Sequence, residues 1–202
     1  MARTTPEEAF AEARAAMERG DWEGVFACLD PSVVARIAEN GVARFLVGGE
    51  TAADAFTALC GEHAVPEPMI LALRALLERI AESARASVVP AARSDPGAML
   101  AQSLRHKQIV DEYRKALKDT LKAVPDLPRF TAALERALRA AGGGGSVSSK
   151  LFVDEVLDDV TIAGSAAWAT RRTSAGHAED VGFVRRKGVW SIRLFAKRPG
   201  RP

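Results

Sequence analysis

The sequence predicts an α+β protein in which N-terminal helices and a helical insertion pack on a C-terminal, curved, antiparallel sheet of four strands. Three observations lead to this prediction. Apolar residues recur at helical spacing through most of residues 1–141. A run of glycines at 142–145 is the one clear break in composition, and beyond it apolar residues alternate as they do in strands.

The first helix is predicted to begin at Thr5. Threonine is a good N-cap, Pro6 suits the first helical position, and Glu8 completes a capping box. Apolar residues then form one stripe along the helix, and Gly20 is predicted to end it.

Two more short helices follow within the opening segment, residues 1–49. One is capped by Asp21, and the other begins at Asp30-Pro31 and is expected to end at Asn40-Gly41. Residues 42–49 fit either a short strand or the tail of a helix.

Residues 50–141 are predicted to form a helical insertion. Long amphipathic helices are expected over 66–92 and 95–124, because their apolar residues recur every three or four positions. Prolines interrupt the pattern at 125–128, and one further helix is expected to run to about Ala141.

Residues 142–149 read as a flexible Gly/Ser joint, residues 150–197 as the sheet, and residues 198–202 as a polar tail that we expect to be poorly ordered. The first strand is expected over 151–162 with a bulge near Asp158-Asp159. The last two strands meet at Lys187-Gly188, where glycine permits a tight hairpin.

The last strand places three apolar residues on one face of the sheet: Trp190, Ile192 and Leu194. In the second strand, Ala166, Trp168 and Thr170 alternate in the same way. All three tryptophans of the chain are expected in the core.

Two parts of the chain resemble the nuclear-transport-factor-2-like superfamily, in its branch of small bacterial domains. The opening resembles that family's helix, Gly-Asp-Trp, helix start, and the end resembles its closing strands. The matching stretches are Thr5-Pro-Glu-Glu-Ala-Phe, Met17-Glu-Arg-Gly-Asp-Trp-Glu-Gly-Val, Val160-Thr-Ile-Ala-Gly-Ser-Ala-Ala-Trp, Val181-Gly-Phe-Val and Lys187-Gly-Val-Trp-Ser-Ile.

This resemblance implies a curved sheet wrapped around helices into a cone whose mouth often holds a ligand. It also permits dimers through the open sheet face. The helices of 50–141 depart from the family pattern, so either they cap or fill the cone, or the chain is a helical bundle with an appended meander.

We expect a non-enzymatic binding or assembly module that engages a protein partner or its own copy, because long amphipathic helices are abundant and no catalytic motif is present. The alternative is a small-molecule-binding protein or an isomerase- or cyclase-like enzyme, as in ketosteroid-isomerase-like and SnoaL-like relatives of the family. That alternative would use an apolar pocket with His106 and Tyr113.

His106 and Tyr113 are the weak catalytic candidates, since they lie seven residues apart on one face of a predicted helix. The ordinary interpretation is a half-buried pair with satisfied hydrogen bonds. His63 and His177 lie in predicted turns and are expected at the surface.

Other candidates lie in the predicted sheet. Trp168, Trp190 and Phe183 could line an apolar ligand pocket. Arg172 and Arg186 could contact an anion, although charged residues commonly protect sheet edges from aggregation.

The composition limits other functions. A net charge of +2 makes nucleic acid an improbable partner, and no motif predicts a metal or a cofactor, so we expect neither. No apolar run is long enough to span a membrane, and the start lacks a signal-peptide pattern. Cys28 and Cys60 are expected to be buried free thiols, and the chain is expected to be cytoplasmic.

Overall fold

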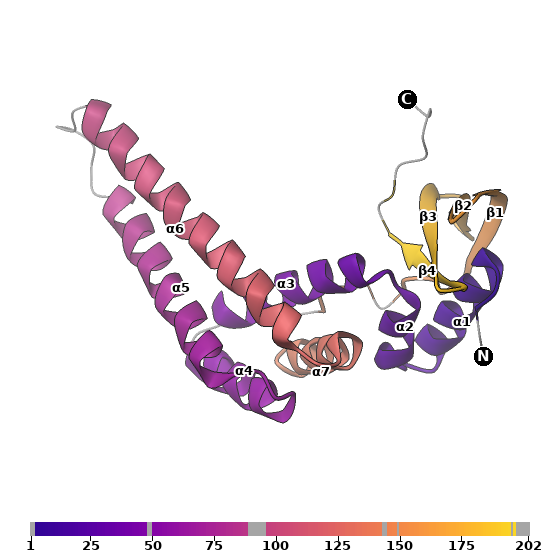
Figure 1. Cartoon of the computed structure of the whole chain (residues 1–202), viewed down its shortest axis with the longest axis horizontal. Helices are drawn as coiled ribbons and strands as arrows, with labels where there is room; N and C mark the ends of the chain where they lie inside the picture. Colours follow the sequence, from indigo (N-terminus) through magenta and orange to yellow (C-terminus); the bar gives the residue numbers. More distant parts are fainter. Residues whose placement is uncertain are drawn as a thin grey trace. The chain divides into compact units, whose positions relative to one another are not determined.

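The computed structural model describes residues 3–47, 50–88, 96–142, 145–148, 150–194 and 196. Within them are seven helices and one four-stranded antiparallel sheet, which confirms the α+β class (Figure 1). The chain forms two compact units. The first consists of Met1–Gly41 and Leu127–Pro202, and the second of Val42–Asp126.

The first unit begins with α1 (Pro6–Glu18) and α2 (Trp22–Cys28). The predicted capping box is present, because the Thr5 hydroxyl accepts a hydrogen bond from the Glu8 backbone N–H at 3.1 Å while the Glu8 carboxylate accepts from the Thr5 N–H. Asp21 caps α2 as predicted, accepting from the Gly24 N–H at 2.9 Å. Local sequence signals therefore set both helix starts.

α3 (Pro31–Val47) continues through Asn40-Gly41, so the predicted helix end at that point is wrong. Of the two alternatives for 42–49, the helix tail is correct as far as Val47, and residues 48–49 lie outside the described residues. Gly41 does not end the helix, and its lack of a side chain is explained by packing instead. A Cβ at this position would lie 2.5 Å from Leu134 Cδ2, so the glycine permits close packing against α7 (Leu127–Ala140).

The sheet consists of β1 (Glu155–Ala163), β2 (Ala166–Thr173), β3 (Ala178–Arg186) and β4 (Val189–Arg193), in that spatial order. It is curved and does not close on itself (Figure 1). A cone is not established by this arrangement.

Two local features of the sheet agree with prediction and one does not. The register shifts between Asp158 and Thr161, which is the predicted bulge. Lys187 and Gly188 both have positive φ, 50° and 83°, as a tight hairpin requires. However, β1 begins at Glu155 rather than at residue 151, because Phe152 and Asp154 adopt left-handed backbone conformations that end any extended run.

One face of the sheet packs against the opening helices. It carries Ala167 and Ala169 on β2, Phe183 on β3, and Trp190 and Ile192 on β4, all 2% exposed or less. The prediction for β4 is thus confirmed. For β2 it is wrong, because the alanines occupy the core positions.

Trp168 lies on the other face of the sheet. Its partners across the strands are Gly182 and then Arg193, and its side chain is only half-buried. The pattern at 166–170 did not reveal which alternate set of residues faces the helices, since small alanines occupy the tightly packed side.

The second unit contains α4 (Glu50–Glu62), α5 (Glu67–Val88) and α6 (Pro96–Ala123), together with the end of α3. The predicted insertion, 50–141, thus differs from the observed unit, because α7 belongs to the first unit. The predicted ends of the long helices in 89–95, much of the 142–149 joint and the 198–202 tail lie outside the described residues. Among the described helices, none is both long and apolar enough to cross a membrane.

Candidate functional site: the α5–α6 hairpin

α5 and α6 form an antiparallel hairpin that changes character along its length (Figure 1). Near the start of α5 and the end of α6 the seam is closed by apolar side chains. The buried residues of this closed end are Ile70, Leu73, Tyr113, Leu117 and Leu121. Toward Val88 and Pro96 the seam opens, and polar and small residues replace the leucines.

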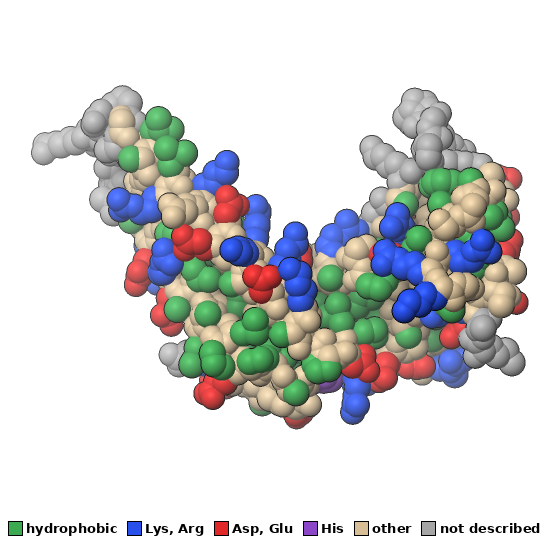
Figure 2. Space-filling model, viewed as in Figure 1, with side chains coloured by type: hydrophobic (Ala, Val, Ile, Leu, Met, Phe, Trp, Pro, Cys, Tyr) green, Lys and Arg blue, Asp and Glu red, His purple; other side chains and the backbone are tan. Residues whose placement is uncertain are grey.

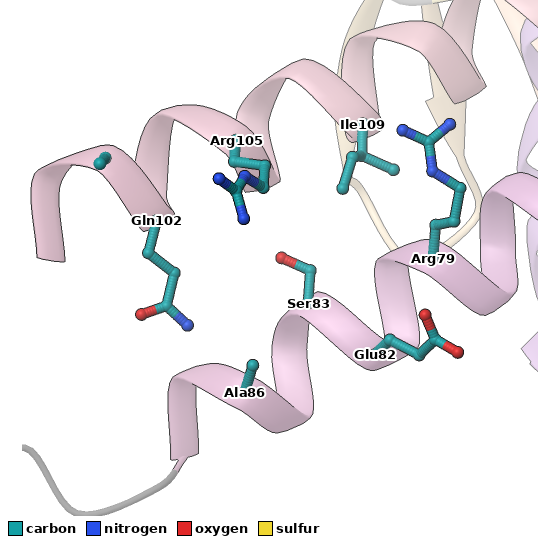
Figure 3. Close-up of a pocket in the computed structure, with 8 residues that line it drawn as sticks. Arg79, Glu82, Ser83, Ala86, Gln102, Arg105 and Ile109 are labelled. Carbon is teal, nitrogen blue, oxygen red and sulfur yellow. The ribbon is translucent and has the colours of Figure 1, made fainter. Parts of the chain in front are cut away.

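A hollow of about 620 Å³ occupies this open half of the seam (Figure 3). In the figure, the Ser83 hydroxyl points from α5 toward α6, while Gln102 and Arg105 extend from α6. The full lining is Arg79, Glu82, Ser83, Ala86, Ala101, Gln102, Arg105 and Ile109. Small and polar residues therefore separate the two helices here.

His106 lies beside this hollow and contacts Ser83 across the seam. The His106 Nδ1 and Ser83 Oγ atoms are 3.2 Å apart. A nucleophilic serine needs a base that a third group orients, usually a carboxylate. Within the described residues no carboxylate is hydrogen-bonded to His106, so the contact ties the two helices together rather than forming a triad.

Tyr113, the other weak catalytic candidate, is 8% exposed and belongs to the closed end of the hairpin. It lies two helical turns from His106 and does not line the hollow. Both residues belong to the second unit, which does not contain the sheet. The predicted pocket that combines them with the sheet is therefore not assembled within either unit.

The hairpin exposes large apolar side chains. Four are more than half exposed, namely Leu71 (55%) on α5 and Met99 (51%), Leu100 (62%) and Leu104 (59%) on α6. Figure 2 shows apolar side chains at the end of the hairpin near residues 88 and 96, and Lys and Arg side chains along its length. The three on α6 lie together near its start, whereas Leu71 lies near the start of α5, at the opposite end of the hairpin. Exposed apolar residues that cluster as those on α6 do are typical of interaction surfaces.

Leu100 and Leu104 lie one turn apart on what we call the outer face of α6, the side away from the seam. At 3.6 residues per turn this face continues through exposed residues Lys107, Asp111, Lys115 and Lys118. A shallow hollow of about 470 Å³ follows the same face, lined by Leu104, Lys107, Gln108, Asp111, Glu112 and Lys115. The outer face of α6 therefore has two exposed leucines near its start, followed by a stripe of basic residues, Lys107, Lys115 and Lys118, which we call the basic stripe.

The candidate ligand-binding residues of the sheet are not brought together around a cavity. Trp190 and Phe183 are 1% and 2% exposed and fill the core between sheet and helices. Trp168 lies on the opposite face. Of the hollows described, none is lined by these three side chains.

The candidate anion-binding arginines also lie apart and are paired. Arg172 Nε is 3.2 Å from Asp158 Oδ2 at the β2–β3 hairpin end of the sheet. Arg186 Nη2 is 3.2 Å from Asp30 Oδ2 at the other end. They therefore form no joint site.

Of the remaining histidines, His63 follows the end of α4 and is half-buried, and exposed His177 donates its backbone N–H to Thr173 Oγ1 at 3.2 Å. Within the described ranges, no group of three or more His, Cys, Asp or Glu residues is placed to hold a metal ion.

The two cysteines are free and buried, one in each unit. Burial raises the pKa of Cys28, and raises that of Cys60 to about 12. Both thiols are thus protonated at neutral pH and are poor nucleophiles.

Sequence reasoning missed a hollow of about 510 Å³ in the first unit. α3 contributes Arg36, Ile37 and Asn40 to it, and the segment before the sheet contributes Ser146 and Leu151. No motif indicates these residues. The one available signal was the exposed Arg-x-x-x-Asn spacing on α3, which places both side chains on one face.

No protein-family model, curated protein or solved structure matches this chain.

Proposed function

We propose that this protein is a non-enzymatic binding module, and that the outer face of α6 binds an acidic amphipathic helix of a protein partner. The observation that supports this most directly is the exposure of Leu100 and Leu104, one turn apart at the start of a basic stripe. Helices bind helices through apolar residues at such i, i+4 spacing.

Leu100 and Leu104 would supply much of the binding energy. Fully burying a leucine side chain contributes about 1.5–3 kcal/mol, so two adjacent leucines supply a useful anchor for a docked helix. The 470 Å³ hollow beside Leu104 supplies a place for side chains of the partner. Because Leu100 and Leu104 face away from the seam, their burial would not require the hairpin to open.

The charge of the stripe specifies the partner. Lys107, Lys115 and Lys118 are exposed, and among the residues that the structure describes none of them forms an ion pair, whereas Asp111 is paired with Arg114 at 3.6 Å. A partner with acidic residues following its apolar anchors matches this arrangement. Two copies of this face would instead place lysines against lysines, which disfavours self-association there.

The polar seam supports a binding function rather than catalysis. Ser83 is engaged with His106, and Arg79 Nη1 lies 3.0 Å from Glu112 Oε2, so these groups connect the two helices. We regard the hairpin as a scaffold that presents the outer face of α6.

We also infer that the first unit is a nuclear-transport-factor-2-like domain. The inference is supported by the sequence motifs at both ends of the chain and by a curved antiparallel sheet that packs on the opening helices. The two free thiols support a reducing, cytoplasmic location.

The test is fluorescence anisotropy with two labelled helical peptides that share leucines at i and i+4 but carry either glutamates or lysines on the polar face. We expect the acidic peptide to bind at least about tenfold more tightly, and Leu100→Ser with Leu104→Ser to remove that binding. Leu71→Ser is the matched control, since Leu71 is similarly exposed on α5.

Equal binding of both peptides, or binding that the double variant leaves unchanged, would contradict the proposal. Light scattering tests whether a second copy of this chain occupies the face instead. A dimer that is lost in the Leu100→Ser, Leu104→Ser variant would show that it does. Salt-sensitive binding to heparin that exceeds binding to the acidic peptide would point to nucleic acid instead.

A further inference from the structure

The 510 Å³ hollow in the first unit has the composition of a small-molecule site. Its floor is apolar, with buried Ile37 and Leu194 and half-buried Leu151. Its polar residues come from three segments: Arg36 and Asn40 from α3, Ser146 and Ser148 from the segment before the sheet, and Arg171 from β2. Ligand pockets typically combine an apolar lining of this size with a few polar groups that orient the ligand.

A buried carboxylate fixes the wall that carries Ser146. Glu135 on α7 is 1% exposed and accepts hydrogen bonds from the backbone N–H groups of Ser146 and Val147 at 2.7 and 2.9 Å. Arg139 Nη2 donates to the Val147 carbonyl at 2.6 Å. These charge-assisted bonds hold the wall in place without a ligand.

The Ser146 hydroxyl itself is left without a partner. Its oxygen is shielded from solvent and forms no hydrogen bond with any described residue. It lies close to Gly41, where a Cβ would be 3.3 Å from it. A buried hydroxyl with no partner destabilises the folded protein, and an acceptor atom of a ligand in the hollow would offset that cost.

The charged residues around the hollow indicate what kind of ligand group would accept the hydrogen bond from Ser146. Arg171 also lines the hollow, but it is held by Glu155, whose two carboxylate oxygens lie 3.3 Å from Nη1, and by Glu179. Its charge is therefore more than balanced within the protein. Arg36 and Asn40 lie one turn apart on α3 and line the hollow together with Ser146, so residues that carry a guanidinium, an amide and a hydroxyl surround one space.

A second, smaller hollow continues from the first along α3. The two share Arg36 and Leu194, and the second adds Arg193. Arg193 and Arg186 both approach the buried carboxylate of Asp30, at 3.7 and 3.2 Å, so two arginines share one acid. This end of the cleft consequently favours an anion.

We propose that this cleft binds an amphipathic carboxylate, a small organic acid with an apolar chain. The carboxylate accepts hydrogen bonds from Arg36, Asn40 and Ser146, and the apolar chain covers Ile37, Leu151 and Leu194. The site is independent of the partner-binding face of α6, which belongs to the other unit.

Isothermal titration calorimetry tests the proposal with three probes of equal chain length: decanoate, decanamide and decyltrimethylammonium. Decanoate is expected to bind at least about tenfold more tightly than the neutral amide, and the cation more weakly than both. Arg36→Gln is expected to weaken decanoate binding about tenfold. Arg172→Gln is the control, because Arg172 is paired with Asp158 and does not line the cleft.

Ser146→Ala separates a binding role from a structural one. It removes the unpaired hydroxyl, so the unliganded protein is expected to be as stable as the original or more stable, while decanoate affinity falls several-fold. Equal affinity for all three probes would show unspecific uptake of the alkyl chain. Decanoate binding that neither Arg36→Gln nor Ser146→Ala changes would likewise overturn the proposal.

The same titrations distinguish this proposal from the one for α6. If decanoate binds but the acidic peptide does not, only the proposed function fails. If the peptide binds and decanoate does not, only the carboxylate site fails.

Discussion

Both units expose a few large apolar side chains, but in the first unit these are Val156 and Ile162 on the edge strand β1, whereas in the second they lie on the α5–α6 hairpin. In the first unit the opening helices cover one face of the sheet, and large residues such as Trp190, Phe26 and Phe183 are 2% exposed or less. In the second unit the α5–α6 hairpin leaves Leu71 on α5 and Leu104 on α6 more than half exposed.

The difference follows from how many neighbours each element has. A helix that packs on a sheet and on another helix has most of its apolar surface covered, whereas a helix of a two-helix hairpin has one covered face. Apolar residues on the uncovered face of α6 contribute nothing to the hairpin itself. Their exposure there is the observation behind the binding role proposed for this face.

The largest expected effect concerns the core of the first unit. Trp190→Ala should lower the free energy of unfolding by about 3–5 kcal/mol, because it leaves a cavity between β4 and the opening helices. Leu104→Ala on α6 should change it by no more than about 0.5 kcal/mol. Urea titrations followed by circular dichroism measure both.

Fluorescence makes this comparison specific to one unit. Trp22, Trp168 and Trp190 all belong to the first unit, so tryptophan emission follows its unfolding alone. A loss below about 1 kcal/mol for Trp190→Ala would show that the first unit lacks the closed core described above.

The next effect concerns Asp30, which is fully buried where α3 begins. Burial acts to raise the pKa of this carboxyl group, but hydrogen bonds from the Ser32 side chain and backbone, with Arg186 and Arg193, outweigh burial and hold the pKa below its usual value of 3.8. We expect Asp30→Asn to cost about 1–3 kcal/mol.

The stability difference between the original protein and Asp30→Asn should depend on pH in a definite direction. Because the folded pKa of Asp30 is lowered, its contribution is fully present above the unfolded value of 3.8 and is lost as the pH falls through the folded pKa. The stability difference between the two proteins should therefore be constant from neutral pH to about pH 5 and shrink in stronger acid. Asp158→Asn, at an exposed ion pair, should show a much smaller difference at every pH.

The parts of the fold that the sequence predicted are those set by a few neighbouring residues. The capping box at Thr5, the Lys187-Gly188 hairpin and the bulge after Asp158 all depend on local backbone chemistry. Such features need no knowledge of what packs against them.

The parts that the sequence did not predict depend on contacts between distant segments. Asn40-Gly41 has the sequence pattern of a helix end, and only the fold shows that Leu134 packs over Gly41. The core face of β2 consists of alanines, whose sequence pattern does not distinguish the two faces of the strand. The cleft residues Arg36 and Ser146 are 110 positions apart, and only the fold brings them together. The candidate site residues were chosen from the sequence by residue type alone. The hollows of the structure are formed by segments that only the packing of the fold brings together.

Gly41 and Gly61 offer a matched pair, one from each unit, whose substitutions should have effects of opposite sign. At Gly41 an added methyl group would meet Leu134, which is 1% exposed and cannot easily move, so Gly41→Ala should cost about 1–3 kcal/mol. Gly61, inside α4, has open space around it, so Gly61→Ala should stabilise the protein by up to about 1 kcal/mol. Thermal unfolding of the two variants measures both signs, and a stabilising Gly41→Ala would show that α3 and α7 are not closely packed.

The last prediction compares the two units within one molecule through their cysteines. Cys28 belongs to the first unit and Cys60 to the second, and both thiols are buried with raised pKa values. Each reacts with iodoacetamide only when its surroundings open, so the labelling rate reports local stability. Because the second unit has fewer covered faces, Cys60 should be labelled at least about tenfold faster than Cys28 in low urea, a difference of about 1.4 kcal/mol in opening free energy.

Peptide mass spectrometry measures both rates in the unmodified sequence at pH 8, with fully unfolded protein as the reference for intrinsic reactivity. Equal rates would mean that the units open together, and the contrast between a covered sheet unit and an exposed hairpin would then describe their surfaces but not their stability.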